Sequence, residues 1–592
     1  MIMKKEVFIL YVCVIGLVSI PEKGNAQCFR WQPEYEELTD ARKAAVEEWS
    51  KLKDSVFVSW GSTDVRYVKT EIPRSLVRRQ LWKGRAWRGE RVNAQAFIRT
   101  LKDLKQVEVS VSDLEAAGGG KITAQHVNAG FVRYVMTDEL NKDKRGTCGY
   151  RPDRTLFDSS LVADVIDRNV IECIEAKSVR PLWVTVRVPS ETPPGIYRGK
   201  LTFNREEIAP LTIELNVSSR QLPAPGDWAF RLDLWQNPYA VARFYDLPLW
   251  SEEHLEAMRP LMQLLADAGQ KTITASIMHK PWGGQTEDYF KSMVMRVKTL
   301  EGKWIYDYAV FDKWVEFMME LGIDRQINCY TMIPWDLSFR YFDQASDSFQ
   351  SIRADVGSPE YIAYWQPFLM DFARHLKEKG WFEITTIAMD ERPMKAMQKA
   401  IRIIREADPA FQIALAGNYH ADIEADIFDY CLASAQVFPE KVLQERRKSG
   451  KISTYYTCCS ESYPNTFTFS PPAESAWLGW YAAAKNFDGY LRWAYNSWTK
   501  DPLRDSRFRA FGGGDCYLVY PGGRSSIRME RLIEGIQDYE KIRILKNECE
   551  EKNNTAGLKR IEKMLADFEI DRLPEQSAAE MIRKARQLLN KL

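Results

Sequence analysis

The sequence predicts a (β/α)8 barrel of the TIM type, preceded by an antiparallel β-sandwich domain and followed by a helical C-terminal extension. Its 592 residues are too many for a single hydrophobic core, so several domains are expected. In the first third of the chain, strand-like segments follow one another with short turns between them. Between residues 229 and 495, apolar strands instead alternate with amphipathic helices until eight strands are reached, as in barrels of this class.

The first segment has the pattern of an export signal. Lys4 and Lys5 precede a short apolar run, and the small residues at 24–26 match a signal-peptidase site. The run is too short and too poorly flanked for a membrane span. We therefore expect residues 1–26 to be a signal peptide and the protein to be exported, periplasmic or secreted. A lipid anchor at Cys28 is the less favoured alternative, because Gln27 is a poor residue before a lipidated cysteine.

The β-sandwich domain is predicted at residues 27–222. Its clearest strand, 181–188, alternates so that Trp183 and Thr185 share one face while aliphatic residues occupy the other. This pattern predicts a strand that is buried on one side only. Turn residues then lead into two further strands, and a proline-rich linker at 221–226 ends the domain.

The catalytic barrel is predicted at residues 223–510. Long irregular inserts at 279–310 and 458–472 follow strands, so they fall on the face where barrel enzymes hold their active sites. The predicted strands are residues 229–235, 272–278, 326–333, 383–390, 412–416, 431–435, 452–457 and 489–495. The predicted helices are residues 251–268, 311–321, 359–379, 394–407, 421–429, 440–449 and 473–486.

The last segment, 511–592, is predicted to pack on the barrel. It begins with a turn-rich, β-like stretch and becomes helical and charged after Ile527. Periodicity assigns four of its charged residues to a solvated helix face: Glu530, Glu534, Lys541 and Arg543.

Charge and cysteine content exclude several classes of function. The formal net charge is +1 without a basic block, which does not indicate nucleic acid or an anionic membrane surface as a partner. The ten cysteines show no disulfide framework, and the vicinal pair Cys458 and Cys459 is interpreted as small buried apolar residues. Among the five histidines none is paired at metal-ligand spacing, so we expect no metal and no cofactor.

Asp390 and Glu391 are the candidate catalytic residues. They end the fourth predicted strand, and Pro393 forbids its continuation. Such a dipeptide is common in surface turns, but the C-terminal ends of barrel strands carry catalytic groups in this architecture. The 12% share of aromatic residues adds to the expectation, because surplus rings often line sugar sites. We therefore expect a glycoside hydrolase.

The adjacency of the two acids favours one mechanism. Successive strand residues point to opposite faces, so neighbours do not obviously bracket an anomeric carbon at the ~5–5.5 Å of a retaining double displacement. In substrate-assisted hydrolysis the 2-acetamido oxygen of the sugar is the nucleophile instead. Glu391 is then predicted to be the acid and later the base. Asp390 is predicted to hold the acetamido N–H and to stabilise the oxazolinium-like intermediate.

Several motifs along the chain occur together with this pair, in the order Pro193-Pro194-Gly195-Ile196-Tyr197-Arg198-Gly199, Asp390-Glu391-Arg392-Pro393, Gly514-Asp515, Tyr520-Pro521-Gly522, Ser526-Ile527-Arg528-Met529-Glu530 and Gly535-Ile536-Gln537-Asp538-Tyr539-Glu540. Their order resembles glycoside hydrolase family 123 over nearly the whole mature chain. The resemblance implies an exo-acting, retaining β-N-acetylgalactosaminidase that acts by substrate assistance on an oligosaccharide or glycolipid glycan. It maps the Asp-Glu pair of the family onto Asp390 and Glu391.

Six polar or aromatic residues at strand ends are candidates for substrate binding, and core packing is an equal alternative for each. On the eighth strand, alternation predicts that Trp493 and Tyr495 both point into the barrel, where one of the two rings could stack against the sugar ring. The six are Tyr330, Trp335, Asn418, Tyr456, Trp493 and Tyr495.

Two other functions stay open. One is a conventional retaining β-glycosidase with Glu391 as acid/base and Glu461, after the seventh strand, as nucleophile. The other is a non-catalytic glycan-binding protein that uses the aromatic residues as a platform.

Overall fold

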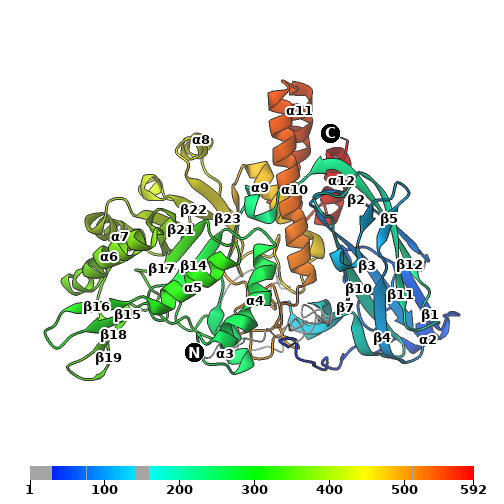
Figure 1. The fold of residues 1–592 in the computed structure, drawn as a ribbon, viewed down its shortest axis with the longest axis horizontal. Helices are drawn as coiled ribbons and strands as arrows, with labels where there is room; N and C mark the ends of the chain where they lie inside the picture. Colours follow the sequence, from blue (N-terminus) through cyan, green and yellow to red (C-terminus); the bar gives the residue numbers. More distant parts are fainter. Residues whose placement is uncertain (1–29, 75–76, 140–158, 510, 592) are drawn as a thin grey trace, which may run out of the picture.

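A computed structural model describes residues 30–74, 77–139, 159–509 and 511–591. A β-sandwich and a barrel lie side by side, and the long helix α10 (Ile527–Glu551) stands between them (Figure 1). The predicted signal peptide and Cys28 lie outside the described residues. Within those described residues, every helix is too short or too polar to cross a membrane.

The N-terminal sheets form the predicted sandwich around one apolar core. Leu182 and Val184 of strand β10 point into this core, whereas Trp183 points the other way and packs with Ile527 of α10. The prediction of a half-buried strand is therefore wrong, because α10 covers its outer face. One sheet has the order β1 (Val56–Trp60), β3 (Arg91–Thr100), β10 (Ser178–Arg187), β7 (Val127–Asp138) and β8 (Ser159–Ile166). The other has the order β2 (Leu81–Arg88), β12 (Leu211–Gln221), β11 (Gly195–Phe203), β4 (Leu104–Val111) and β9 (Val170–Ile174), with β5 (Leu114–Ala116) and β6 (Lys121–Ile122) beside β11.

Eight parallel strands form the barrel, which confirms the predicted fold class. The first and last strands of the sheet path meet at a bridge between Leu232 and Gln270, where the Lys271 N–H donates to the Leu232 carbonyl at 3.1 Å. The side-chain oxygen of Gln236 accepts from the Thr274 N–H at 2.9 Å and continues this seam. The strands are β13 (Arg231–Leu234), β14 (Thr272–Ser276), β17 (Gln326–Tyr330), β20 (Thr385–Met389), β21 (Gln412–Gly417), β22 (Asp429–Ala433), β23 (Ile452–Tyr456) and β24 (Gly489–Arg492).

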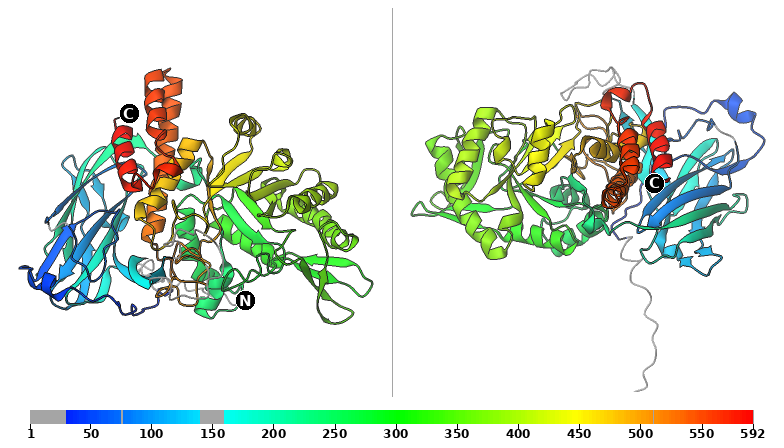
Figure 2. Two further views of the ribbon diagram at one scale, coloured as in Figure 1. Left: turned by 180° about the vertical axis from the view of Figure 1, so that it is seen from behind. Right: turned by 90° about the horizontal axis from the view of Figure 1, so that it is seen from above.

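Helices surround the barrel (Figure 2). Helix α6 has its predicted bounds because Ser358 caps its N-terminus and Gly380, at φ 72°, ends it in the left-handed region. The predicted helix at 421–429 is wrong: only a 3₁₀ turn at Glu424–Asp426 fits before β22 begins at Asp429. The helices are α3 (Pro238–Tyr245), α4 (Glu252–Ala266), α5 (Ala309–Glu320), α6 (Pro359–Lys379), α7 (Met394–Ala407), α8 (Glu440–Lys448) and α9 (Pro472–Lys485).

The insert after β14 is not irregular, contrary to its prediction. It contributes β15 and β16 to a four-stranded sheet, completed by two strands that follow β17. We call this the rim sheet: β15 (Met295–Lys298), β16 (Trp304–Asp307), β18 (Ser338–Asp343) and β19 (Ser348–Arg353).

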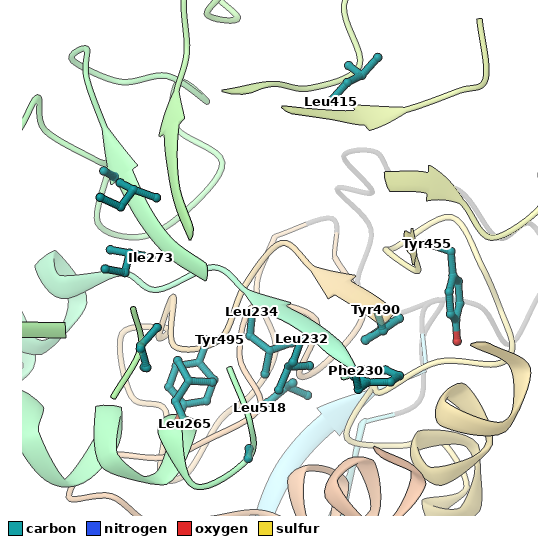
Figure 3. Packing of buried hydrophobic residues seen from close by; sticks show 14 of the residues in the cluster. Phe230, Leu232, Leu234, Leu265, Ile273, Leu415, Tyr455, Tyr490, Tyr495 and Leu518 are labelled. Carbon is teal, nitrogen blue, oxygen red and sulfur yellow. The ribbon is translucent and has the colours of Figure 1, made fainter. Parts of the chain in front are cut away.

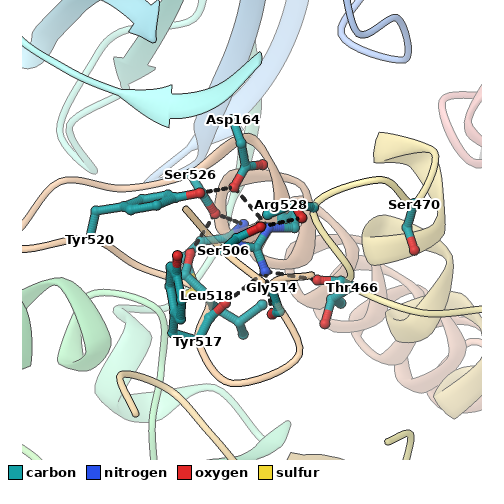
Figure 4. A network of polar contacts seen from close by, with 12 residues as sticks. Asp164, Thr466, Ser470, Ser506, Gly514, Tyr517, Leu518, Tyr520, Ser526 and Arg528 are labelled. Carbon is teal, nitrogen blue, oxygen red and sulfur yellow. Dashed lines mark hydrogen bonds and ion pairs between the residues drawn. The ribbon is translucent and has the colours of Figure 1, made fainter. Parts of the chain in front are cut away.

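The stretch 511–526 contains turns and isolated bridges, and the predicted β-structure is not formed. The buried Arg528 side chain takes the place of a strand partner: it donates to the carbonyls of Gly514 and Tyr517 at 3.0 and 2.7 Å (Figure 4). It also donates to Asp164 of strand β8 at 2.9 Å, and Tyr520 donates to the same carboxylate at 2.6 Å. This network ties the segment after the barrel to the sandwich.

Helix α10 is buried where the sequence predicts a solvated face. Glu530, Glu534 and Lys541 are each less than a tenth exposed, because they pair with residues of the sandwich. Glu534 accepts from Asn93 at 3.0 Å, and Lys541 contacts Glu90. The C-terminal region ends with α11 (Thr555–Leu565) and α12 (Ala578–Leu589).

Candidate active site

A cavity of about 650 Å³ opens at the C-terminal ends of the barrel strands. Because the strands are parallel, side chains that follow different strands meet at this mouth. The lining side chains include Trp235 after β13, Trp282 after β14, Trp335 after β17, Asp390 and Glu391 after β20, Tyr456 at the end of β23 and Trp493 after β24.

Asp390 is held by two indole groups. Its Oδ2 accepts hydrogen bonds from Nε1 of Trp282 at 2.9 Å and of Trp335 at 3.2 Å. Its Oδ1 is buried and has no hydrogen-bond partner among the described residues. Burial raises the pKa of Asp390 to about 6, since the charged form loses solvation, and the two indole N–H groups oppose that rise. At neutral pH the side chain is thus a carboxylate with one unused acceptor.

Glu391 is the exposed neighbour of this buried acid. Its Oε1 accepts a hydrogen bond from the Tyr456 hydroxyl. Burial and the adjacent Glu391 carboxylate both raise the pKa of Tyr456, so the phenol stays protonated and remains a donor. The two acids therefore have different environments: Asp390 is fixed and desolvated, and Glu391 lies where a substrate can reach it.

Two stacked indole rings line the cavity together with Asp390 and Glu391. Trp235 and Trp282 stack with centroids 4.9 Å apart and an interplanar angle of 25°. Tyr330 packs against both rings, at 4.4 and 5.2 Å, but it is buried and does not line the cavity. It supports the wall from behind.

Trp493 follows β24, the strand next to β13, and also lines the cavity; a buried ion pair positions its ring. Its Nε1 donates to Oδ2 of Asp515 at 3.2 Å, and Oδ1 of Asp515 pairs with Arg492 at 2.5 Å. Both partners of the ion pair are fully buried. Burial raises the pKa of Asp515 to about 6, and Arg492 opposes the rise. The stretch after the barrel thus reaches back to the cavity.

Tyr495 does not point into the barrel with Trp493. Its hydroxyl donates to the carbonyl of Leu261 in α4 at 2.8 Å, and its ring lies among the buried side chains around Leu265 (Figure 3). The reason is that β24 ends at Arg492, so strand alternation does not extend to this residue.

Asn418 and Glu461 do not line the cavity either. Asn418 is exposed, and its side-chain oxygen accepts from Gln436 at 2.7 Å. Glu461 accepts from the Cys458 N–H at 2.8 Å and from Ser434 at 2.9 Å. These bonds tie the Glu461 carboxylate to its own loop and to the residue that follows β22. The structure thus brings Trp335, Tyr456 and Trp493 to the two acids, and leaves the other predicted binding residues outside.

Sequence reasoning missed Trp235, Trp282 and Asp515. Trp235 directly follows the first strand, so strand counting could have found it, whereas Trp282 lies six residues after the second strand, inside the insert. Nothing in the sequence pairs Asp515 with Trp493. Cys459 is disulfide-bonded, so its interpretation as a plain apolar residue is wrong, whereas Cys458 is free. Over the residues with described placement, no group of three His, Cys, Asp or Glu side chains could hold a metal ion.

Comparisons with known proteins place this geometry in context. The model of the glycoside hydrolase 123 catalytic domain matches residues 235–545, and that of the glycoside hydrolase 123 N-terminal domain matches residues 60–205. A family 123 glycoside hydrolase from Clostridium perfringens, whose structure addressed glycolipid glycan hydrolysis, is 25% identical with a TM-score of 0.78, covering 90% of this chain and 99% of that one. A protein from Bacteroides vulgatus described as a candidate glycoside hydrolase is 10% identical with a TM-score of 0.29, covering 78% and 79%. No curated protein sequence matches.

Proposed function

Because this chain belongs to glycoside hydrolase family 123 and is therefore a glycoside hydrolase, we propose that it removes terminal β-linked N-acetylgalactosamine from glycans or glycolipids by substrate-assisted catalysis. One observation carries the mechanism: two indole N–H groups hold Oδ2 of Asp390 and leave the buried Oδ1 without a partner among the described residues. This oxygen can accept a hydrogen bond from the acetamido N–H of the substrate. The glycolipid hydrolysis studied in the Clostridium perfringens relative supports the substrate class.

In the proposed first step, Glu391 donates its proton to the glycosidic oxygen as the bond to the anomeric carbon breaks. The acetamido oxygen of the same sugar attacks that carbon from the other side, so an oxazolinium ion forms. Asp390 accepts the acetamido N–H and stabilises the positive charge. Because Asp390 is buried, its charge acts in a medium of low dielectric constant, where it is worth more than in water.

In the proposed second step, Glu391 takes a proton from water, which attacks the anomeric carbon and opens the oxazolinium ring. Two displacements at the same carbon retain its configuration. The Tyr456 hydroxyl stabilises the Glu391 carboxylate that exists between the two steps. The stacked Trp235 and Trp282 offer an apolar floor for the sugar ring.

The conventional alternative needs Glu461 as nucleophile. The bonds that Glu461 accepts from Cys458 and Ser434, and its position outside the cavity lining, argue against it. Membership of a hydrolase family likewise favours an enzyme over a non-catalytic glycan-binding protein. Export remains part of the proposal. It is supported by the signal-like N-terminus and by the disulfide at Cys459, because disulfides persist in oxidising compartments.

The test uses aryl β-glycosides of N-acetylgalactosamine, N-acetylglucosamine and galactose. We expect hydrolysis of the N-acetylgalactosaminide with retention and none of the galactoside, which lacks the acetamido nucleophile. Asp390→Asn and Glu391→Gln should each lower kcat by at least ~100-fold, whereas Glu461→Gln should retain most activity. Cleavage of the galactoside, or a sugar covalently linked to Glu461, would contradict substrate assistance.

A further inference from the structure

A cluster of three basic side chains around His279 lies beside the rim sheet, close in sequence to the cavity residues Trp282, Gly283 and Gly284. We call it the rim cluster: His279, Lys280, Lys291 and Arg340. The His279 ring lies 3.4 Å from an Arg340 nitrogen, measured from Nε2. The Lys280 ammonium lies over the Tyr289 ring at 4.3 Å, and the Arg340 guanidinium lies over the Phe349 ring at 4.0 Å. Both rings are exposed, so the cluster combines positive charge with apolar ring surface.

The rim cluster shares its loop with the catalytic cavity. Lys280 is two residues before Trp282, the residue whose indole holds Asp390. The backbone N–H of Trp335, whose indole also holds Asp390, donates to the carbonyl of Pro281 at 3.1 Å. Gly283 and Gly284, which follow directly, line the cavity. The cluster is therefore joined to the cavity wall through the loop that contains Lys280, Trp282 and the two glycines.

The positive charges of the rim cluster have no acidic counterpart. Among the described residues, no carboxylate lies within ion-pair distance of Lys280, Lys291 or Arg340, whereas Arg353 on the same rim sheet pairs with Asp336 at 3.1 Å. Burial, followed by the charges of the three neighbouring cations, lowers the pKa of His279 to about 4. His279 is thus neutral at physiological pH and can accept or donate one hydrogen bond. Unpaired like charges that lie close together repel one another and favour an anion between them.

We propose that the rim cluster binds an anionic group, a carboxylate or a sulfate, on the glycan to which the terminal N-acetylgalactosamine is attached. The proposal rests on the proposed function, because it assigns the leaving-group side of the same cavity. Cations together with exposed Tyr289 and Phe349 rings suit an acidic sugar, which presents C–H faces as well as charge. The acidic group would be held by Arg340 and Lys280 while the terminal sugar lies over Trp282.

The test compares three substrates built on one trisaccharide with a terminal β-linked N-acetylgalactosamine on galactose: the neutral trisaccharide, its sialylated derivative and its sulfated derivative, both modified on that galactose. For the wild type we expect kcat/KM to be about 10-fold higher for an anionic substrate than for the neutral one, corresponding to one tenfold step in affinity. The ratio should fall toward one in Lys280→Ala/Arg340→Ala and with rising NaCl. Lys303→Ala, an exposed lysine between β15 and β16, is the matched control and should keep the ratio.

A second measurement does not depend on hydrolysis. Calorimetry of the wild-type enzyme with sialylated, sulfated and neutral galactosides that lack N-acetylgalactosamine should show tighter binding of an anionic one, lost in Lys280→Ala/Arg340→Ala. If the enzyme binds only the sialylated or only the sulfated galactoside, the result identifies which anionic group the rim cluster recognises. If the neutral trisaccharide is not cleaved, the proposed function fails, and calorimetry still decides this inference. Equal binding of all three galactosides overturns it. It is also overturned if the double variant loses binding only to phosphatidylglycerol vesicles, because the cluster would then contact a membrane.

Discussion

The indole N–H of Trp282 donates a 2.9 Å hydrogen bond to Oδ2 of Asp390, and the two residues follow β14 and β20, which β17 separates in the barrel sheet. This bond fixes the orientation of the carboxylate and stabilises its charged form against burial. A residue from the second strand thereby controls an acid on the fourth.

Trp282→Phe keeps an aromatic ring and removes the N–H donor. A hydrogen bond to a carboxylate lowers its pKa, so its loss should raise the pKa of Asp390 above the present value of about 6. We expect the acidic limb of the pH profile of kcat/KM to move to higher pH, with about 10-fold lower kcat at neutral pH. Trp235→Phe is the control. Trp235 stacks on Trp282, and its replacement by Phe makes the same change in ring size. An equal shift in both variants would contradict a role for the N–H.

The wild-type enzyme should lose activity as the pH falls through about 6. Asp390 must be a carboxylate to accept the acetamido N–H, and burial raises its pKa to about 6, so protonation below that pH removes the acceptor. The measurement is kcat/KM from pH 4 to 9, which reports the free enzyme. The acidic limb should be absent from the residual activity of Asp390→Asn; a limb that persists there belongs to another group.

Breaking the buried pair behind Trp493 should be costly. Asp515→Ala leaves the Arg492 charge fully buried and unpaired, for which we expect a loss of about 3–5 kcal/mol in the free energy of unfolding. Denaturant unfolding followed by tryptophan fluorescence measures it. Asp336→Ala breaks the exposed pair with Arg353 and should cost no more than ~1 kcal/mol. Comparable losses in the two variants would mean that the buried pair does not stabilise the fold.

Gly535→Ala should destabilise the contact between α9 and α10. A Cβ at Gly535 would lie 2.2 Å from the carbonyl oxygen of Ala476, a backbone atom that cannot rotate away. We expect a loss of about 1–3 kcal/mol or more, measured as a lower Tm. Gly118→Ala is the control, because nothing lies within 4 Å of its added Cβ. An unchanged Tm in Gly535→Ala would show that the helices can separate without cost.

Elements with strong local signals could be predicted. The helix opened by Ser358 and closed by Gly380 has its predicted bounds, since its caps and periodicity lie within the element itself. The alternation of Trp183 was also visible, but its burial was not, because the helix that covers it begins more than 300 residues later, at Ile527. Glu534 and Lys541 were assigned to solvent for the same reason: their partners lie on the sandwich.

The sequence by itself determined the order of strands and helices, and hence the placement of Asp390 and Glu391 at the end of the fourth barrel strand. Local patterns suffice for this, because the period of an element and its caps are properties of neighbouring residues. Only the tertiary structure decided which side chains surround that pair: Trp282 and Trp335 on Asp390, Tyr456 on Glu391. These contacts join residues far apart in the chain, and their geometry follows from the closure of the barrel, which no local pattern contains.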